Sequence, residues 1–227
     1  MPAWPPGWPR CPRWRERWQS VTPAPVPGDP RRHRIGSERW NPLDALALAT
    51  STFVPVLDQV GPDRLGASTP CDEWDVRELL GHMVVGAQMT VALLDGASLD
   101  EAKSFWGQEF GDDVVDVCRE ELAVHLDRFQ VVTDWEAPVH HVVGDIPAAQ
   151  LLGFRIGDLT LHTWDLATAL GVDDGIPDDL AAVVFANLEP MAPFIGEIGM
   201  FGSGPSGTVG GDAPVKTRLL DLSGRRP

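Results

Sequence analysis

Tyrosine is absent from this chain of 227 residues, and lysine occurs only at Lys103 and Lys216. The chain is rich in arginine, alanine, glycine and proline, a bias typical of high-GC genomes that says nothing about the fold. The three cysteines, Cys11, Cys71 and Cys118, lie far apart and form no Cys-x-x-Cys pair. This spacing supports neither a disulfide framework nor a thiolate zinc site, and we expect a cytoplasmic protein.

Basic residues and long hydrophobic runs are also scarce. The formal net charge is −15, and no stretch approaches the roughly 18 uncharged apolar residues of a membrane-spanning helix. No short apolar core follows a basic N-terminus as it does in a secretory signal. Because binding to phosphate groups needs a basic face, we expect no nucleic-acid partner and no membrane association.

Residues 1–40 differ in composition from the rest of the chain. They hold five of the nine tryptophans, nine of the 21 prolines, eight arginines and only three acidic residues. Such a segment has no apolar period and cannot bury a continuous face, so we predict a disordered extension. A basic, aromatic arm for RNA or lipid is the alternative, although the composition favours an unstructured or spuriously translated segment. The predicted domain, residues 41–227, holds ten basic and 30 acidic residues and thus carries a net charge of −20.

Apolar residues recur at helical spacing through most of residues 41–227. We expect an extended segment with a turn over 137–147 and a glycine-rich irregular region over 195–211. Long amphipathic helices with little strand character indicate an all-α helix bundle with an irregular C-terminal extension. The predicted helices span about 42–60, 75–94, 112–129, 147–170 and 177–191, and a last amphipathic turn spans 213–224.

Capping residues mark several of these helix ends. Asn41 is suited to an N-cap, with a proline next to it at the first helical position. Asp75 and Glu78 have the spacing of a capping box, and Gly171 has the position of a C-terminal glycine. Pro55 lies inside the first predicted helix, and we expect it to kink or split that helix.

The predicted helix over 147–170 holds the most informative polar residues. Asp158, His162 and Asp165 follow one another at i, i+4 and i+7, so they lie on one stripe beside the apolar face. A carboxylate and an imidazole one turn apart can bind a single cation without bending the backbone, which makes Asp158 and His162 candidate metal ligands. A solvated polar face can contain the same pair by chance, so this pair alone does not decide between a metal site and a solvated surface.

The other histidines give weaker signals. His82 borders the apolar stripe of the second predicted helix, where a histidine often only bonds a carbonyl group. His125 lies on the apolar stripe of the third predicted helix. His140 and His141 are adjacent in the extended segment, so they point to opposite faces and cannot bind one ion together.

Three segments, in this order, resemble a known family. They are Ser68–His82 (STPCDEWDVRELLGH), Gly157–Ala167 (GDLTLHTWDLA) and Leu219–Pro227 (LLDLSGRRP). Together they are similar to the actinobacterial metal-binding proteins of the DinB superfamily, which are related to the N-terminal domain of mycothiol-dependent maleylpyruvate isomerase. The resemblance spans roughly residues 41–227, and the ordered triple match is far more specific than any one segment.

The resemblance implies a DinB-like four-helix bundle with a metal site built from two helices. Carried over by position, His82, Asp158 and His162 are the metal ligands. Two histidines and one carboxylate leave coordination positions open, as catalytic sites do. Asp165, one turn beyond His162, would orient an imidazole, unless it is an exposed charge.

The sequence departs from the isomerase pattern in two ways. Asp158 stands where the isomerase has glutamate, which shortens the reach of the carboxylate by one methylene group. The isomerase also has a C-terminal domain that contributes to catalysis, and no stretch after Ile195 is long enough to be that domain. Isomerase activity is therefore not expected from the metal site alone.

Three hypotheses about function follow. In the first, a divalent ion, zinc before nickel, iron or manganese, binds a low-molecular-weight thiol, by resemblance mycothiol, and the thiolate attacks a small electrophile in a transferase or isomerase reaction. A metal-activated water would instead make the protein a hydrolase. The second hypothesis is a non-catalytic metal-binding or stress-related module, and the third is an acidic helix bundle without a metal. The substrate, and the choice between monomer and homodimer, stay open.

Overall fold

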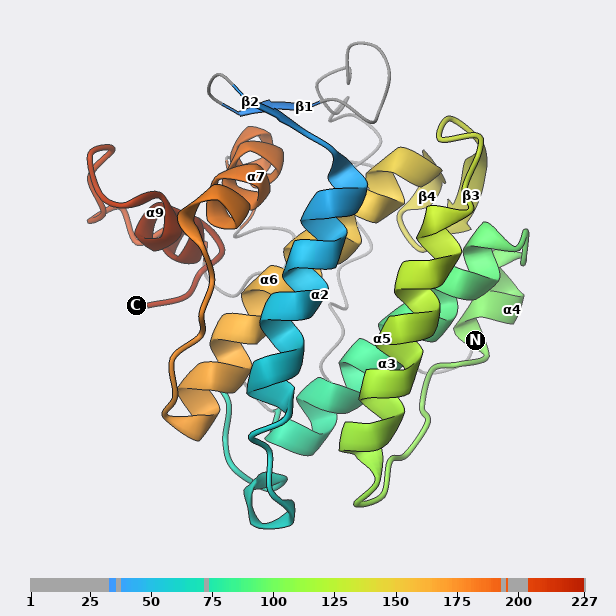
Figure 1. Cartoon of the computed structure of the whole chain (residues 1–227), viewed down its shortest axis with the longest axis horizontal. Coiled ribbons are helices and arrows are strands. Elements are labelled where there is room, and N and C mark those ends of the chain that lie inside the picture. Colours follow the sequence, from blue (N-terminus) through green and yellow to red (C-terminus); the bar gives the residue numbers. More distant parts are fainter. Residues whose placement is uncertain (1–32, 36–37, 72–73, 193–194, 196–203, 227) are drawn as a thin grey trace.

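The computed structural model describes residues 33–35, 38–71, 74–192, 195 and 204–226. Most of these residues are helical (Figure 1), so the predicted all-α fold is confirmed. The helices are α2 (Pro42–Leu57), α3 (Val76–Leu94), α4 (Leu99–Lys103), α5 (Val114–Gln130), α6 (Ala148–Leu170), α7 (Asp178–Leu188) and α9 (Val215–Leu222), with short 3-10 helices η1 (Pro62–Arg64) and η2 (Glu189–Met191). The strands are β1 (His33–Ile35), β2 (Glu38–Trp40), β3 (Pro138–His141) and β4 (Gly144–Pro147).

The four long helices α2, α3, α5 and α6 enclose one apolar core. Helix α2 packs against α6 and α5, and α3 packs against the same two helices, so the four contacts close a bundle (Figure 1). All four helices contribute large, fully buried side chains to the core, among them Phe53, Leu80, Phe129 and Leu159. Helices α7 and α9 pack on each other, and α7 also contacts α6, at the side of the bundle.

The predicted caps are present. The side chain of Asn41 accepts a hydrogen bond from the backbone N–H of Leu43 at 3.1 Å. Asp75 and Glu78 form both hydrogen bonds of a capping box at the start of α3. Gly171 ends α6 with φ of +73°, in the left-handed region that a side chain disfavours. The second and third of these caps mark where α3 begins and where α6 ends.

The structure differs from the sequence predictions in several details. Pro55 does not split α2, which runs through it and ends soon after, at Leu57. Because few residues follow Pro55 in the helix, the hydrogen bond that it removes lies near the fraying end. The short helix α4 was not expected, since five residues do not show a helical period. Residues 138–147, within the segment expected to be extended with a turn, form the antiparallel hairpin β3–β4.

The two ends of the chain are described in part. Within the predicted disordered extension, 1–40, strands β1 and β2 pair antiparallel, and residues 1–32 and 36–37 lie outside the described residues. Of the region 195–211, which we expect to be irregular, residues 196–203 also lie outside them, and 204–211 contain no helix or strand. The last amphipathic turn is the helix α9.

Candidate metal centre

Helices α3 and α6 bring together the three predicted metal ligands. Asp158 Oδ1 lies 3.3 Å from Nε2 of His82, on α3, and 3.3 Å from Nε2 of His162, one turn further along α6. One ligand atom from each residue lies within 4.8 Å of the other two. Two ligands bound to one zinc ion at about 2.0–2.1 Å in a tetrahedral site are about 3.3–3.4 Å apart. The two imidazoles and the carboxylate therefore fit a single small cation, both in spacing and in donor type.

Asp165 is not an exposed charge but a buried partner of His162. Its residue is fully buried, and its Oδ2 lies 2.9 Å from His162 Nδ1. A hydrogen bond from Nδ1–H to this carboxylate turns Nε2 towards Asp158 and His82, where it can bind a metal ion once it has lost its proton. This is the arrangement that orients metal-bound histidines in other proteins.

Arg225, near the C-terminal end of the chain, pairs with the same carboxylate. Its Nε donates to Asp165 Oδ1 at 3.0 Å, and its Nη2 donates to Oδ2 at 2.6 Å. Burial alone would raise the pKa of Asp165, but the charge of Arg225 and the hydrogen bond from His162 hold it at about 2. Asp165 is therefore ionised at neutral pH. The sequence did not indicate this role for Arg225, although the residue lies in the third resembling segment.

A second arginine, Arg155, lies under the carboxylate of Asp158. Its Nη1 donates to Asp158 Oδ2 at 2.5 Å, and its side chain is only 8% exposed. Its Nε and Nη2 are buried and have no hydrogen-bond partner within the described part of the chain. The sequence analysis missed Arg155 because an arginine on a helix is usually solvated.

The charges in this cluster perturb one another. Burial alone would raise the pKa of Asp158, but Arg155, His82 and His162 hold it well below its usual value. Burial lowers the pKa of His82. Burial would also lower the pKa of His162, but its hydrogen bonds and charge interaction with Asp158, and its hydrogen bond to Asp165, raise it well above normal. The carboxylate of Asp158 is therefore ionised, and it favours a positive charge on His162 beside it.

Cys71 and Trp74 complete the surroundings of the two histidines. The Cys71 thiol donates to Asp165 Oδ2 at 3.3 Å and lies 3.9 Å from His162 Nδ1. Trp74 packs against both imidazoles, with ring centroids 4.8 Å from His82 and 5.9 Å from His162. Cys71, His162 and Asp165 also have ligand-type atoms within 4.8 Å of one another. Both oxygens of Asp165 already accept hydrogen bonds from Arg225. This second group is therefore less suited to bind a cation than the group of His82, Asp158 and His162.

The remaining histidines lie outside the cluster. His125 is fully buried in α5, and neither of its ring nitrogens has a partner within the described residues. His140 is exposed and lies 2.8 Å from Asp145 across the β3–β4 hairpin. His141 packs against Phe154. The two adjacent histidines therefore have different partners.

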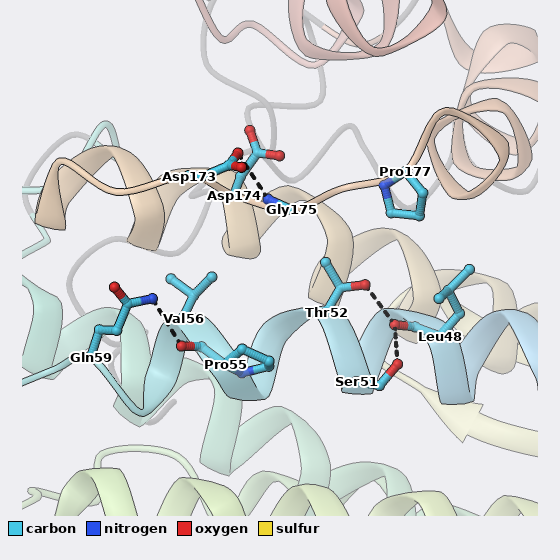
Figure 2. A pocket seen from close by; sticks show the side chains of 10 residues that line it. All are labelled: Leu48, Ser51, Thr52, Pro55, Val56, Gln59, Asp173, Asp174, Gly175 and Pro177. Carbon is cyan, nitrogen blue, oxygen red and sulfur yellow. Dashed lines mark hydrogen bonds between the residues drawn. The ribbon is translucent and has the colours of Figure 1, made fainter.

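A cavity of about 310 Å³ lies away from this centre, between α2 and the connection from α6 to α7 (Figure 2). Figure 2 shows that the side chains of Ser51, Thr52, Gln59 and Asp173 bond to nearby backbone groups. The hydroxyls of Ser51 and Thr52 donate to the carbonyl of Leu48, and the amide of Gln59 donates to the carbonyl of Pro55. The carboxylate of Asp174 accepts hydrogen bonds from the backbone N–H of Ile176 and from Lys216 Nζ.

The bundle and the cluster together define a DinB-like helical protein with a His-Asp-His group held by two of its helices. The family model of the mycothiol maleylpyruvate isomerase N-terminal domain matches residues 46–167, more than half of the chain. The chain therefore belongs to this family. The matched region includes the three predicted ligands together with Arg155 and Asp165, whereas Arg225 lies beyond it.

Two further comparisons found similar proteins. An uncharacterised protein of Mycobacterium tuberculosis, matched in strains CDC 1551 and H37Rv, is 28% identical over 141 residues, which cover 62% of this chain and 74% of that protein. The crystal structure of the mycothiol-dependent maleylpyruvate isomerase superposes with a TM-score of 0.53 at 19% identity, covering 68% of each chain. A histidine-to-alanine mutant of that enzyme gives the same TM-score at 18% identity. At this identity the likeness shows the fold.

Among the residues that the structure describes, no helix is both long enough and apolar enough to cross a bilayer.

Proposed function

We propose that this protein binds one divalent metal ion, zinc in the first place, through His82, Asp158 and His162, and that it uses mycothiol or a similar thiol to act on a small electrophile. The observation that supports this proposal is the convergence of three ligand atoms within 4.8 Å, from two helices. Membership of a family named for a mycothiol-dependent isomerase supports the thiol. Three protein ligands leave at least one position on zinc for an exogenous ligand. A cytoplasmic location stays a prediction.

The residues of the cluster would have distinct parts in this chemistry. His82 and His162 would ligate through Nε2, and Asp158 through Oδ1. When bound, the metal lowers the pKa of a thiol ligand, so that a thiolate is available at neutral pH. Asp165 holds Nδ1–H of His162 and thereby keeps its Nε2 available. Trp74 packs against both imidazoles and limits their rotation.

The reaction begins with the same step whichever product forms. The sulfur of the thiolate uses its electron pair to form a bond to an electrophilic carbon of the substrate. In a transferase, a leaving group departs from that carbon with its bonding pair. In an isomerase, the attack breaks the π bond of a conjugated carbon–carbon double bond, and its electron pair moves onto the carbonyl oxygen as an enolate. After rotation about the resulting single bond, the pair returns, the double bond forms again and the thiolate departs. Asp158 stands where the isomerase has a longer carboxylate, so the substrate of the isomerase is not carried over to this chain. We therefore propose the attack by a thiolate and leave the identity of the electrophile open.

Metal analysis of the purified full chain tests the proposed centre. We expect about one equivalent of divalent metal per chain after loading with zinc and desalting, and less than about a tenth of that in His82→Ala and His162→Ala, because each change removes a ligand. His140→Ala is the matched control, since His140 is an exposed histidine outside the cluster. Metal content that does not depend on His82 and His162 would reject the site.

Turnover measurements then separate catalysis from metal binding alone. The zinc-loaded chain is incubated with mycothiol and either maleylpyruvate or a chromogenic electrophile such as 1-chloro-2,4-dinitrobenzene. We expect product formation that needs both the thiol and the metal and that disappears in His162→Ala. Metal binding without any turnover would favour a non-catalytic module, and ester hydrolysis without a thiol would favour a hydrolase.

A further inference from the structure

The carboxylate of Asp158 is shared between Arg155 and the two histidines. Its Oδ2 accepts a hydrogen bond from Arg155 Nη1 at 2.5 Å. Its Oδ1 lies 3.3 Å from Nε2 of both His82 and His162. One oxygen therefore faces the point where a cation would bind, and the other is taken by the guanidinium.

The burial of Arg155 stabilises its ion pair with Asp158. Its side chain is only 8% exposed, and Nε and Nη2 find no hydrogen-bond partner among the described residues. A buried charge needs a counter-charge to offset the loss of hydration. The ion pair between Arg155 and Asp158 supplies it, so rotation of Oδ2 away from the guanidinium is disfavoured.

Gly86 on α3 provides the space in which this guanidinium lies. A Cβ atom at position 86 would lie 2.5 Å from Arg155 Nη1 and 3.1 Å from its Cζ and Nη2. Any side chain there would have to displace the guanidinium. Arg155 reaches Asp158 in this geometry because position 86 carries only hydrogen.

We propose that Arg155 is a positioning residue that makes Asp158 a one-oxygen metal ligand and thereby sets the preference of the centre for zinc over manganese. This inference rests on the proposed metal site. Zinc favours four ligands in a tetrahedron, whereas manganese favours octahedral oxygen ligation, to which a carboxylate can contribute both oxygens. With Oδ2 taken by Arg155, Asp158 supplies one oxygen and favours the smaller coordination number.

The test is the ratio of the affinities for zinc and manganese, measured by competition with a chromophoric chelator. The charge of Arg155 repels both dications alike, so the ratio reports ligand geometry and not charge. We expect Arg155→Met to lower the zinc-to-manganese ratio by about tenfold, within the range for residues that orient metal ligands. Arg155→Lys keeps a donor for Oδ2 and should keep the ratio near that of the wild type.

Two glycine variants test the same geometry without removing Arg155. Gly86→Ala should lower the ratio in the same direction by a smaller factor, because its Cβ pushes the flexible end of Arg155. Gly153→Ala on α6 is the control, since the nearest atom to its Cβ is Asn187 Nδ2 at 3.9 Å. The visible absorption of bound cobalt(II) gives an independent signal, because it weakens when the coordination number of the ion rises. We expect this absorption to be weaker in Arg155→Met and Gly86→Ala than in the wild type.

The possible outcomes separate this inference from the proposed function. If the wild-type chain binds neither zinc nor manganese, the metal site itself fails. If it binds both, and Arg155→Met and Gly86→Ala change the two affinities by the same factor with the cobalt spectrum unchanged, the role of Arg155 is rejected and the site stands. Should Arg155→Met fail to fold, Gly86→Ala and Arg155→Lys decide by the same ratio and spectrum.

Discussion

Asp165 connects the C-terminal end of the chain to helix α6. Its two oxygens accept hydrogen bonds from Arg225, and it also pairs with His162, while the residue itself is fully buried. A buried charge that loses its partner is strongly destabilising, whereas removing both partners is much less so. We therefore expect a large coupling between Asp165 and Arg225 in the free energy of unfolding.

We expect Arg225→Gln or Asp165→Asn in the metal-free chain to lower the free energy of unfolding by about 3 kcal/mol, and the double variant to lose much less than the sum of the two. Urea denaturation in the presence of EDTA measures these values. The control is Arg119→Gln, because Arg119 pairs with Asp58 at the surface, where the two side chains are 41% and 53% exposed. A surface pair of this kind contributes about 0–1 kcal/mol. If the Arg119→Gln and Arg225→Gln variants lose equal free energy of unfolding, burial does not strengthen the Asp165–Arg225 pair.

The sequence could predict part of this network and not the rest. Asp165 was found as a neighbour of His162 because helical spacing relates residues three apart, and its orienting role is a prediction that its burial now favours. Arg225 could not be found in this way, since it lies 60 residues further along the chain and no local period relates the two positions. Cys71 was treated only as one of three scattered thiols, and its position beside Asp165 depends on the same long-range contact.

His141 gives the fold a dependence on pH that does not involve the proposed metal ligands. Its Nδ1 accepts a hydrogen bond from the backbone N–H of Val143, its ring packs on Phe154, and burial followed by the charge of Arg155 lowers its pKa to about 4. The unfolded chain takes up this proton near the ordinary pKa of 6.5. Below that pH the unfolded state binds more protons, so this contribution to stability is complete at neutral pH and is lost as the pH falls towards 4.

We expect His141→Gln to flatten the fall in unfolding free energy between about pH 6.5 and 4, where one such group changes it by up to about 1.4 kcal/mol per pH unit. The measurement is urea denaturation at several pH values with EDTA present. His140→Gln is the comparison, because it removes the adjacent exposed histidine, which pairs with Asp145 in the same hairpin. If both variants change the slope equally, burial of His141 is not the cause.

At the scale of helices and strands, the sequence predicted best where capping residues and periodicity agree. The start of α3 follows from Asp75 and Glu78, and the end of α6 follows from Gly171, because side-chain and backbone geometry at these points is local. The hairpin β3–β4 was expected only as an extended segment, since strand pairing is not a local property. Helix α4 was missed because its one local signal is the capping box of Ser98 and Glu101.

Two glycines, one inside α6 and one at its C-terminal cap, should respond in opposite ways to the same substitution. Gly171 has φ of +73°, a conformation in which alanine is strained, so Gly171→Ala should lower the unfolding free energy by about 1 kcal/mol. Gly153 lies inside the helix, and its added Cβ would meet no atom closer than 3.9 Å. Alanine is favoured over glycine there, so Gly153→Ala should raise the unfolding free energy by about 0.5–1 kcal/mol.

Thermal or urea unfolding of the two variants checks these signs. Stabilisation by Gly171→Ala would mean that the left-handed cap is absent in solution. Destabilisation by Gly153→Ala would mean that the space between α6 and Asn187 is tighter than the structure has it.

At the scale of the whole molecule, the candidate site depends on which helices are neighbours. His82 and the pair Asp158 and His162 lie on helices separated by α4, α5 and the β3–β4 hairpin, yet α3 and α6 are in contact. Periodicity predicts each helix but not the order in which helices pack, because any amphipathic face can cover any other. Only the resemblance of three segments to a known family predicted that the two helices share a site.

The excess of acidic residues acts on the molecule as a whole. The formal net charge is −15 at pH 7, and the sequence pI is about 4.6. Like charges at this density oppose the compact state, and salt screens them over about 10 Å at 0.1 M. Surface ion pairs such as Arg119–Asp58 contribute only about 0–1 kcal/mol each, so their screening by salt costs little. Salt should therefore stabilise the metal-free fold at neutral pH.

We expect a rise from 20 to 500 mM sodium chloride at pH 7 to add about 1 kcal/mol, or roughly 2–4 °C in Tm for a chain of this size. Differential scanning calorimetry with EDTA present measures the shift. The control is the same pair of salt concentrations near pH 5, where the net charge is small and the gain should nearly vanish. An equal rise at both pH values would mean that salt acts through hydrophobic burial, in which case the acidic surface does not limit the stability of this bundle.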